Sequence, residues 1–163
     1  MRLYGITGWK NTGKTTLTER LIAEMVRRGL KVSSVKHAHH NTEIDHEGRD
    51  SHRHRLAGAG QVIVASPNRW ALMSELRGAP EPALADLLQL FDPCDLVLIE
   101  GYKSAAHPKV EAYREAVGRS LLAPTNPKIR AIASDCAIES ALPRFDLDDT
   151  AGIANFILKE VGL

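Results

Sequence analysis

The chain has 163 residues, a length that fits one domain and leaves little room for a second. Its 21 Lys and Arg residues balance 20 Asp and Glu residues, so no overall field favours nucleic acid or an anionic membrane. Two cysteines without a Cys-x-x-Cys pair argue against a disulfide framework or a cysteine zinc site. No apolar run is long enough to span a membrane, and no signal-peptide layout is visible. We expect one cytoplasmic domain over residues 1–163 that binds neither nucleic acid nor membrane.

The first half of the chain alternates between strand and helix patterns. Leu3–Ile6 is a short apolar run that predicts a buried strand, and Leu17–Val26 carries apolar side chains at helical spacing. Strand character returns at residues 32–35. The stretch His37–Arg55 is polar, holds six of the seven histidines and is too long for a simple connector, which is typical of a functional loop. Residues 62–73 favour a β-hairpin around Ser-Pro-Asn, although their second half also fits a helix.

The second half continues this alternation. Pro80 and Pro82 precede a predicted helix with apolar positions 84, 87, 88 and 91. Leu96–Ile99 is the most strand-like run and has the continuous apolar character of a central parallel strand. Residues 107–127 are poorly patterned. Two further strands are predicted at 129–133 and 145–147, and a C-terminal helix at 149–161. Strands that alternate with helices indicate an α/β domain on a mostly parallel sheet.

A phosphate-binding motif follows the first predicted strand. Residues 8–15, GWKNTGKT, match G-x-x-x-x-G-K-[ST] at every fixed position and lie between a strand and a helix, as that motif requires. Its glycines let successive N–H groups point at phosphate oxygens, and the start of the helix adds the positive end of its dipole. Lys14 is expected to reach the β- and γ-phosphates, and Thr15 to ligate Mg²⁺. The predicted nucleotide-binding residues are Gly8, Trp9, Lys10, Asn11, Thr12, Gly13, Lys14, Thr15 and Thr16.

Such a site needs a carboxylate at the end of a neighbouring strand. Glu100 follows the apolar run at 96–99 and precedes a glycine, so we predict that it holds Mg²⁺ or its water. Asp45 and Asp50 are candidates to approach the metal or the γ-phosphate from the polar stretch, and the sequence does not decide between them. Taking Asp45, the predicted catalytic residues are Lys14, Asp45 and Glu100, and the predicted metal ligands are Thr15, Glu100 and Asp45.

The histidines of the polar stretch open a second possibility. Imidazoles suit Zn²⁺ and Ni²⁺, but the irregular spacing and the lack of cysteines favour a solvated loop with one or two histidines near phosphate. Arginines of the same stretch are candidates to neutralise phosphates or an anionic partner, or to be solvated surface residues. The side chains concerned are His37, His39, His40, His46, His52, His54, Arg49, Arg53 and Arg55.

Several runs of the sequence resemble one known family. They follow its order over nearly the whole chain, and the Lys-His-x-His-His, Arg-Trp-Ala-Leu-Met and Glu-Gly-Tyr-Lys segments make the likeness specific. The family is the molybdopterin-guanine dinucleotide biosynthesis protein B family, MobB. The matching runs are 8–17, 35–40, 45–51, 57–59, 65–73, 98–103 and 131–135.

The resemblance implies an α/β P-loop NTPase fold with an added β-hairpin or extension, and a weak GTPase that uses GTP and Mg²⁺ and acts mainly as an adaptor. Its implied partners are molybdopterin and a MobA-type nucleotidyltransferase, which joins GMP to molybdopterin to form the guanine dinucleotide. A homodimer is also implied, in which an extra β segment extends the sheet; Lys109–Arg130 and the 62–73 hairpin are the candidates. Asp135 occupies the place where this family's guanine contact is expected, although the chain has no full Asn-Lys-x-Asp motif.

Two other functions remain open from the sequence. A small-molecule P-loop kinase would need an acceptor pocket and an arginine-bearing lid, for which Arg53 and Arg55 are the candidates. A metallochaperone GTPase would deliver nickel through the histidine-rich stretch. Rapid turnover with an added acceptor identifies the kinase, and stoichiometric Ni²⁺ binding identifies the metallochaperone.

Overall fold

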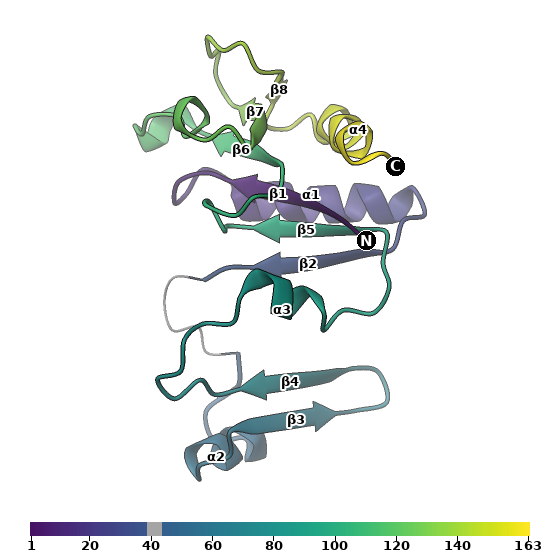
Figure 1. Ribbon diagram of the computed structural model, residues 1–163, viewed down its shortest axis with the longest axis vertical. Coiled ribbons are helices and arrows are strands. Elements are labelled where there is room, and N and C mark those ends of the chain that lie inside the picture. The colour runs from purple at the N-terminus through teal and green to yellow at the C-terminus, as the bar shows by residue number, and fades with distance from the viewer. Residues whose placement is uncertain (39–43) are drawn as a thin grey trace. The chain divides into compact units, whose positions relative to one another are not determined.

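The structure is a computed structural model that describes residues 1–38 and 44–163 (Figure 1). Its contacts divide the chain into two compact units, Met1–Ala38 with Phe91–Leu163, and His39–Leu90. We describe each unit by itself. The division concerns contacts and not independent folding, so one domain over residues 1–163 stays a prediction.

The first unit is built on a six-stranded sheet in which every neighbouring pair is parallel. Its strands in spatial order are β2 (Val32–Lys36), β5 (Leu96–Glu100), β1 (Arg2–Thr7), β6 (Lys109–Tyr113), β7 (Ile129–Ser134) and β8 (Arg144–Asp146). The chain continues from β1 to β2 on one side of the β1–β6 pair, and from β6 to β7 and β8 on the other side, which makes that pair a switch point where such sheets bind ligands. The predicted α/β fold is confirmed.

Two helices of this unit cover one face of the sheet. Helices α1 (Lys14–Arg27) and α4 (Thr150–Val161) pack against each other and against β1. Asp149 caps α4, since its Oδ1 accepts the Gly152 N–H at 2.9 Å. Side chains of the two helices and of alternate strand positions form the main core, which includes Tyr4, Ile6, Leu17, Leu21, Met25, Leu98, Ile153 and Ile157.

Strand β6 lies in a region where the sequence pattern predicts no strand. It lies inside the sheet between β1 and β7, so this part of Lys109–Arg130 is not a segment added at the edge. Lys109 and Glu111 both point away from α1 and α4, and both are fully buried. The Lys109 ammonium donates to the carbonyl oxygens of Ala105 at 2.6 Å and His107 at 2.9 Å. One buried charge thereby fixes the loop that enters the strand.

Glu111 holds a second loop in the same way. Its carboxylate accepts the backbone N–H groups of Leu122 at 2.7 Å and Ala123 at 2.8 Å. Ala123 begins the short 3₁₀ helix η2 (Ala123–Thr125), which follows η1 (Glu115–Val117). Burial raises the pKa of Glu111, and the two N–H donors oppose that rise because they stabilise the carboxylate.

The second unit contains a helix, a hairpin and a short helix. These are α2 (Asp50–Leu56), β3 (Gln61–Ala65), β4 (Trp70–Ser74) and α3 (Leu84–Leu88). The predicted hairpin is confirmed, since β3 and β4 pair antiparallel and bring Val62 opposite Met73. Helix α2 lies in the stretch expected to be a loop, and α3 has only five residues, none of them buried. No helix within the described residues is long and apolar enough to cross a membrane.

Burial of His107 makes the stability of the first unit depend on pH. Burial, and then the charge of Lys109, lower the pKa of His107 from 6.5 to about 4. The unfolded chain therefore binds a proton that the folded chain resists, so stability falls as the pH drops from 6.5 towards 4 and is unaffected above 6.5. We expect a loss of about 1–3 kcal/mol over this range from His107 alone.

Denaturant unfolding of the native chain and of His107→Gln at several pH values measures this loss. The native chain minus His107→Gln difference in unfolding free energy should be constant above pH 6.5 and should fall as the pH drops from 6.5 towards 4, because carboxyl groups act alike in both chains. NMR titration of the native imidazole gives an independent reading. An imidazole that titrates near 6.5 contradicts the prediction.

Candidate functional site

The motif at residues 8–15 forms a loop between the end of β1 and the start of α1. Gly8 and Gly13 have φ angles of 143° and 87°, and Asn11 has a φ of 67°, so the loop has left-handed backbone at three positions. A Cβ atom at Gly8 would collide with the Ala112 carbonyl oxygen of β6. Glycine is therefore required where the loop passes the switch point.

The inner side of this loop has the donors that an anion needs. Gly13 precedes α1 and provides no side-chain cap, so the first N–H groups of the helix are left to a ligand. Within the loop, the Trp9 carbonyl oxygen accepts Thr12 Oγ1 at 2.9 Å and Lys14 Nζ at 2.5 Å. Lys14 Nζ thus turns back into the loop, and its contact with the β- and γ-phosphates stays a prediction.

Charged side chains from the ends of different strands lie near Lys14. Burial lowers the pKa of Lys14, Glu100 opposes this effect, and Lys103 and Lys36 add to it. Two further ammonium groups, those of Lys103 and Lys36, therefore lie close enough to Lys14 to act on it at the carboxyl edge of the sheet. A nucleotide polyphosphate carries the charge that such a group of cations favours.

Glu100 and Thr15 form the part of the site that suits a metal ion. Glu100 ends β5 with its side chain almost buried, and its Oε1 accepts the Thr15 hydroxyl at 2.8 Å. Lys36 Nζ lies 4.0 Å from the same oxygen. A hydroxyl and a carboxylate are hard oxygen donors of the type that Mg²⁺ prefers, so these two residues fit the predicted role.

The chain reverses sharply after Glu100. Gly101 and Tyr102 have φ angles of 96° and 45°, and a Cβ at Gly101 would lie 2.9 Å from the His37 Cβ. The Tyr102 and His37 rings stack with their centres 4.3 Å apart. A non-glycine residue in this conformation is held by its surroundings, and the reversal directs Lys103 back to the phosphate loop.

Asp135 lies just beyond β7 at the same edge of the sheet. Its Oδ1 accepts the Glu115 N–H at 3.0 Å, and its Oδ2 lies 3.6 Å from Arg114 Nη1. The Arg114 side chain in turn lies only 3.2 Å from where a Cβ at Gly13 would be. Arg114 therefore connects Asp135 to the phosphate loop, and reading of a base by Asp135 stays a prediction.

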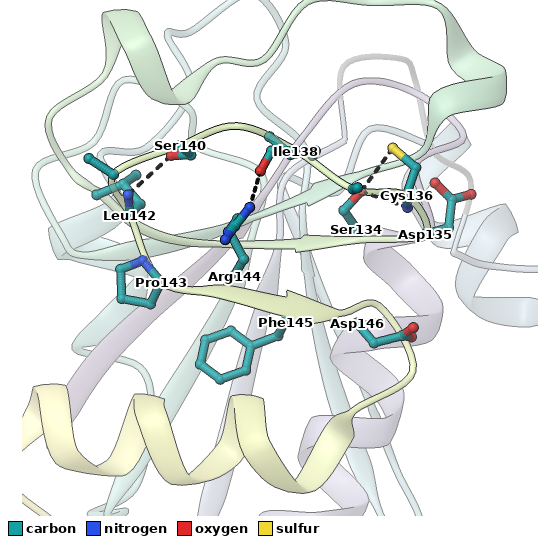
Figure 2. Close-up of a pocket in the computed structure, with 12 residues that line it drawn as sticks. Ser134, Asp135, Cys136, Ile138, Ser140, Leu142, Pro143, Arg144, Phe145 and Asp146 are labelled. Atoms are coloured by element: carbon teal, nitrogen blue, oxygen red, sulfur yellow. Dashed lines mark hydrogen bonds between the residues drawn. The ribbon is translucent and has the colours of Figure 1, made fainter.

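A cavity of about 840 Å³ lies beneath the loop that connects β7 to β8 (Figure 2). Figure 2 shows Asp135 at one end of its lining, with Arg144 donating to the Ile138 carbonyl oxygen. The loop runs from the carboxyl end of β7 back to the start of β8, so the cavity follows the edge strand. Only its Asp135 and Asp146 end reaches the ligand-binding edge.

Asp45 and Asp50 belong to the second unit, so their predicted approach to the metal is not tested. Asp45 Oδ1 accepts the Ser51 hydroxyl at 3.0 Å. Asp50 is the first residue of α2, and its Oδ1 lies 3.7 Å from Arg53 Nη1. Arg55, one candidate for a kinase lid, has a largely buried side chain 3.3 Å from Glu75. Arg55 therefore serves contacts within its own unit.

The histidine-rich stretch is described in part. His39 and His40 lie outside the described residues, and His37 stacks on Tyr102. Across residues 1–38 and 44–163, no group of three His, Cys, Asp or Glu side chains comes together to hold a metal ion.

The structure brings Lys14, Thr15 and Glu100 together and leaves the side chains of Lys10, Asn11 and Thr16 exposed. A glycine-rich loop between a central parallel strand and a helix that begins Lys-Thr defines the P-loop NTPase fold. The sequence model of one family with this fold, described as Molybdopterin guanine dinucleotide synthesis protein B (MobB), matches residues 3–135. The chain belongs to the MobB family.

Named relatives agree with this membership. The Molybdopterin-guanine dinucleotide biosynthesis adapter protein of Haemophilus influenzae is 41% identical over 95% of this chain and 86% of its own length. The Escherichia coli protein of the same name is 36% identical over 96% and 91%. The crystal structure of a MobB protein homolog from Bacillus stearothermophilus superposes with a TM-score of 0.73 at 30% identity, covering 99% of both chains.

Sequence reasoning did not assign Lys103, Arg114 and Arg119, which the structure places around the phosphate loop. Lys103 lies in the Glu-Gly-Tyr-Lys run. The glycine after Glu100 indicates a turn there, and a lysine two residues later could have been predicted to return to the phosphate loop. The two arginines lie within 107–127, where the missed strand hid their position at a sheet edge.

We expect Glu100→Gln to separate metal binding from phosphate binding. The amide keeps an oxygen for the Thr15 hydroxyl but loses the negative charge, so affinity for Mg²⁺-GTP should fall about 10–100-fold. Binding of GTP in EDTA should change by less than about twofold. Calorimetry under both conditions gives the two affinities. Glu139→Gln, an exposed change in the β7–β8 loop, is the matched control. Equal losses with and without Mg²⁺ argue against a metal role for Glu100.

Proposed function

We propose that this protein binds GTP and Mg²⁺ and acts as an adaptor in the maturation of the molybdenum cofactor. The family description and the names of both bacterial relatives support that pathway. The single observation that carries the nucleotide site is the phosphate loop at the switch point, with Thr15 bonded to Glu100. In this proposal the protein assists a MobA-type nucleotidyltransferase as that enzyme attaches GMP to molybdopterin, and it does so in the cytoplasm.

Each part of the loop has a role in the proposal. Backbone N–H groups of residues 8–16 surround the phosphates, and Lys14 adds a charge-assisted bond to the terminal ones. Thr15 and Glu100 would hold Mg²⁺, which supplies charge neutralisation at the β- and γ-phosphates when bound. Asp45 remains the proposed third metal-side residue, with Asp50 as its alternative.

Slow hydrolysis fits this arrangement better than rapid turnover. Glu100 is bonded to the hydroxyl of Thr15, which places it on the metal side of the site and not where an attacking water would be activated. We infer that the chain by itself is a weak GTPase. A kinase requires a lid arginine, and the contact between Arg55 and Glu75 does not favour that function.

The hairpin supports a homodimer. Ile63 and Trp70 are 64% and 68% exposed, and strand alternation puts them with Leu72 on one face of β3 and β4. An exposed apolar face on a two-stranded sheet is typical of a protein interface. We propose that the hairpin joins two copies of the chain.

Replacing the loop lysine tests the nucleotide site. Lys14→Ala removes a charge-assisted phosphate contact, so GTP affinity should fall roughly 10- to 150-fold, equivalent to ~1.5–3 kcal/mol. Calorimetry with GTP and Mg²⁺ measures this loss, and Lys159→Ala in the last turn of α4 serves as the control. A folded Lys14→Ala protein that binds GTP like the native chain refutes the proposed site.

Base recognition is tested at Asp135. A carboxylate there can accept both N1–H and the 2-amino group of guanine, which adenine cannot match. Asp135→Asn puts a donor in place of one acceptor and suits the 2-oxo group of xanthine, so the GTP-to-XTP affinity ratio should fall about tenfold or more. The amide oxygen still accepts the Glu115 N–H, so the local fold should persist. Competition binding of GTP against XTP measures this ratio, with Asp92→Asn as the control. An unchanged ratio means that Asp135 does not contact the base.

A further inference from the structure

Trp9 is the first variable residue of the phosphate loop. Its ring contacts two cationic side chains from separate parts of the chain. Lys103 Nζ lies 4.2 Å from the centre of its ring, and the Arg119 guanidinium carbon lies 5.6 Å from it. The indole N–H of Trp9 donates to the Ser120 carbonyl oxygen at 2.8 Å. The ring thus contacts the turn after Glu100 and also the loop that follows η1.

Both cations are carried by loops that are fixed from within the sheet. The loop of Lys103 is held by the buried Lys109 ammonium, and the Lys103 carbonyl oxygen accepts Asn126 Nδ2 at 2.9 Å. The segment after Arg119 is held by Glu111 through two backbone N–H groups. These bonds place the two cations before any ligand arrives, which is how anion sites gain affinity.

Neither cation is neutralised by a carboxylate. Among the residues that the structure describes, Lys103 and Arg119 form no ion pair. Burial raises the pKa of Glu111 and the charge of Lys103 opposes this rise from a distance, but both Glu111 oxygens accept backbone N–H groups. A ring contact of this kind holds a cation weakly and leaves its charge intact. Lys103 also lies close enough to Lys14 to affect its protonation, which puts it at the phosphate end of the loop.

We propose that Lys103 and Arg119, assembled on Trp9, form a clamp for a phosphoryl group beside the phosphate loop. Lys and Arg are the side chains that bind phosphate oxygens most strongly. The phosphoryl group has two possible sources, the terminal phosphate of a nucleotide in the loop or the phosphate ester of a second ligand. The first source rests on the proposed nucleotide function, and the second is independent of it.

The test uses Trp9 as its own reporter. The chain has two tryptophans, so Trp70→Phe leaves Trp9 as the sole indole. Because Trp70 lies on the proposed dimer face, this parent is first compared with the native chain in oligomeric state and in GTP affinity. In this background we compare Lys103→Gln and Arg119→Gln with Lys159→Gln and Arg2→Gln, which alter an exposed lysine and arginine away from the carboxyl edge. Trp9 emission is followed during titration with GTP, GDP and GMP, and with inorganic phosphate added to the GDP-saturated protein. Lys103→Arg tests whether charge alone restores binding.

Two results support the clamp and identify its source. If the clamp holds the terminal phosphate, Lys103→Gln and Arg119→Gln each weaken GTP about five- to tenfold and leave GDP and GMP within about twofold. If it holds a second ligand, all three nucleotides bind normally, and only the response to inorganic phosphate is lost. In either case Lys103→Arg recovers most of the affinity.

Two other results overturn the clamp. An equal loss for GTP, GDP and GMP shows that the two side chains only support the loop, and no change for any probe shows that they bind no phosphoryl group. Failure of the proposed nucleotide function looks different. In that case the parent protein gives no response to any nucleotide, while inorganic phosphate added without nucleotide still gives a response that is lost in Lys103→Gln and Arg119→Gln.

Discussion

The site depends on two buried charges in the middle of the sheet. Lys109 and Glu111 alternate with the core residues Val110 and Ala112 on β6, so both charges face away from the helices. A buried charge is tolerated only where polar groups replace water. Here carbonyl and N–H groups of two loops replace it, and burial still lowers the pKa of Lys109 to about 8. The buried charges of Lys109 and Glu111 must be hydrogen-bonded, so they fix the positions of the loops at 105–107 and 122–123.

This arrangement makes the carboxyl edge of the sheet a meeting point for segments far apart in the chain. Gly8 passes over Ala112 with no room for a side chain, which fixes the phosphate loop against β6. Arg114 leaves the end of β6, lies against Gly13 and pairs with Asp135 beyond β7. Because each contact joins neighbouring strands, a shift in one strand would be felt by the phosphate loop and by the proposed base-reading residue together.

Most strands and the phosphate loop were predictable from the sequence. Strand β6 and helix α2 were not, because neither has a run of apolar residues at regular spacing. Strands β1, β5 and β7 are apolar runs, and the phosphate loop has fixed residues at fixed spacing, so both follow from local pattern. Strand β6 reads Lys-Val-Glu-Ala-Tyr, an alternation of only five residues that at most indicates a strand with one solvated face and not a buried central strand. Its burial depends on backbone groups of loops at 105–107 and 122–123, and no local pattern contains them. Helix α2 was missed because it buries no side chain and so has no apolar spacing.

The same physics explains why a tryptophan suits the first variable position of the phosphate loop. Lysine and arginine beside a carboxylate would be neutralised, and an incoming phosphate would have to displace that partner. An indole ring attracts a cation by about 0.5–1 kcal/mol at an exposed site, enough to orient it and too little to compete with phosphate. Lys103 and Arg119 lie on such a ring, whereas Arg114 is paired with Asp135. Of these three side chains, Arg114 is therefore already compensated by a carboxylate, whereas Lys103 and Arg119 form no ion pair and keep their charge for a ligand.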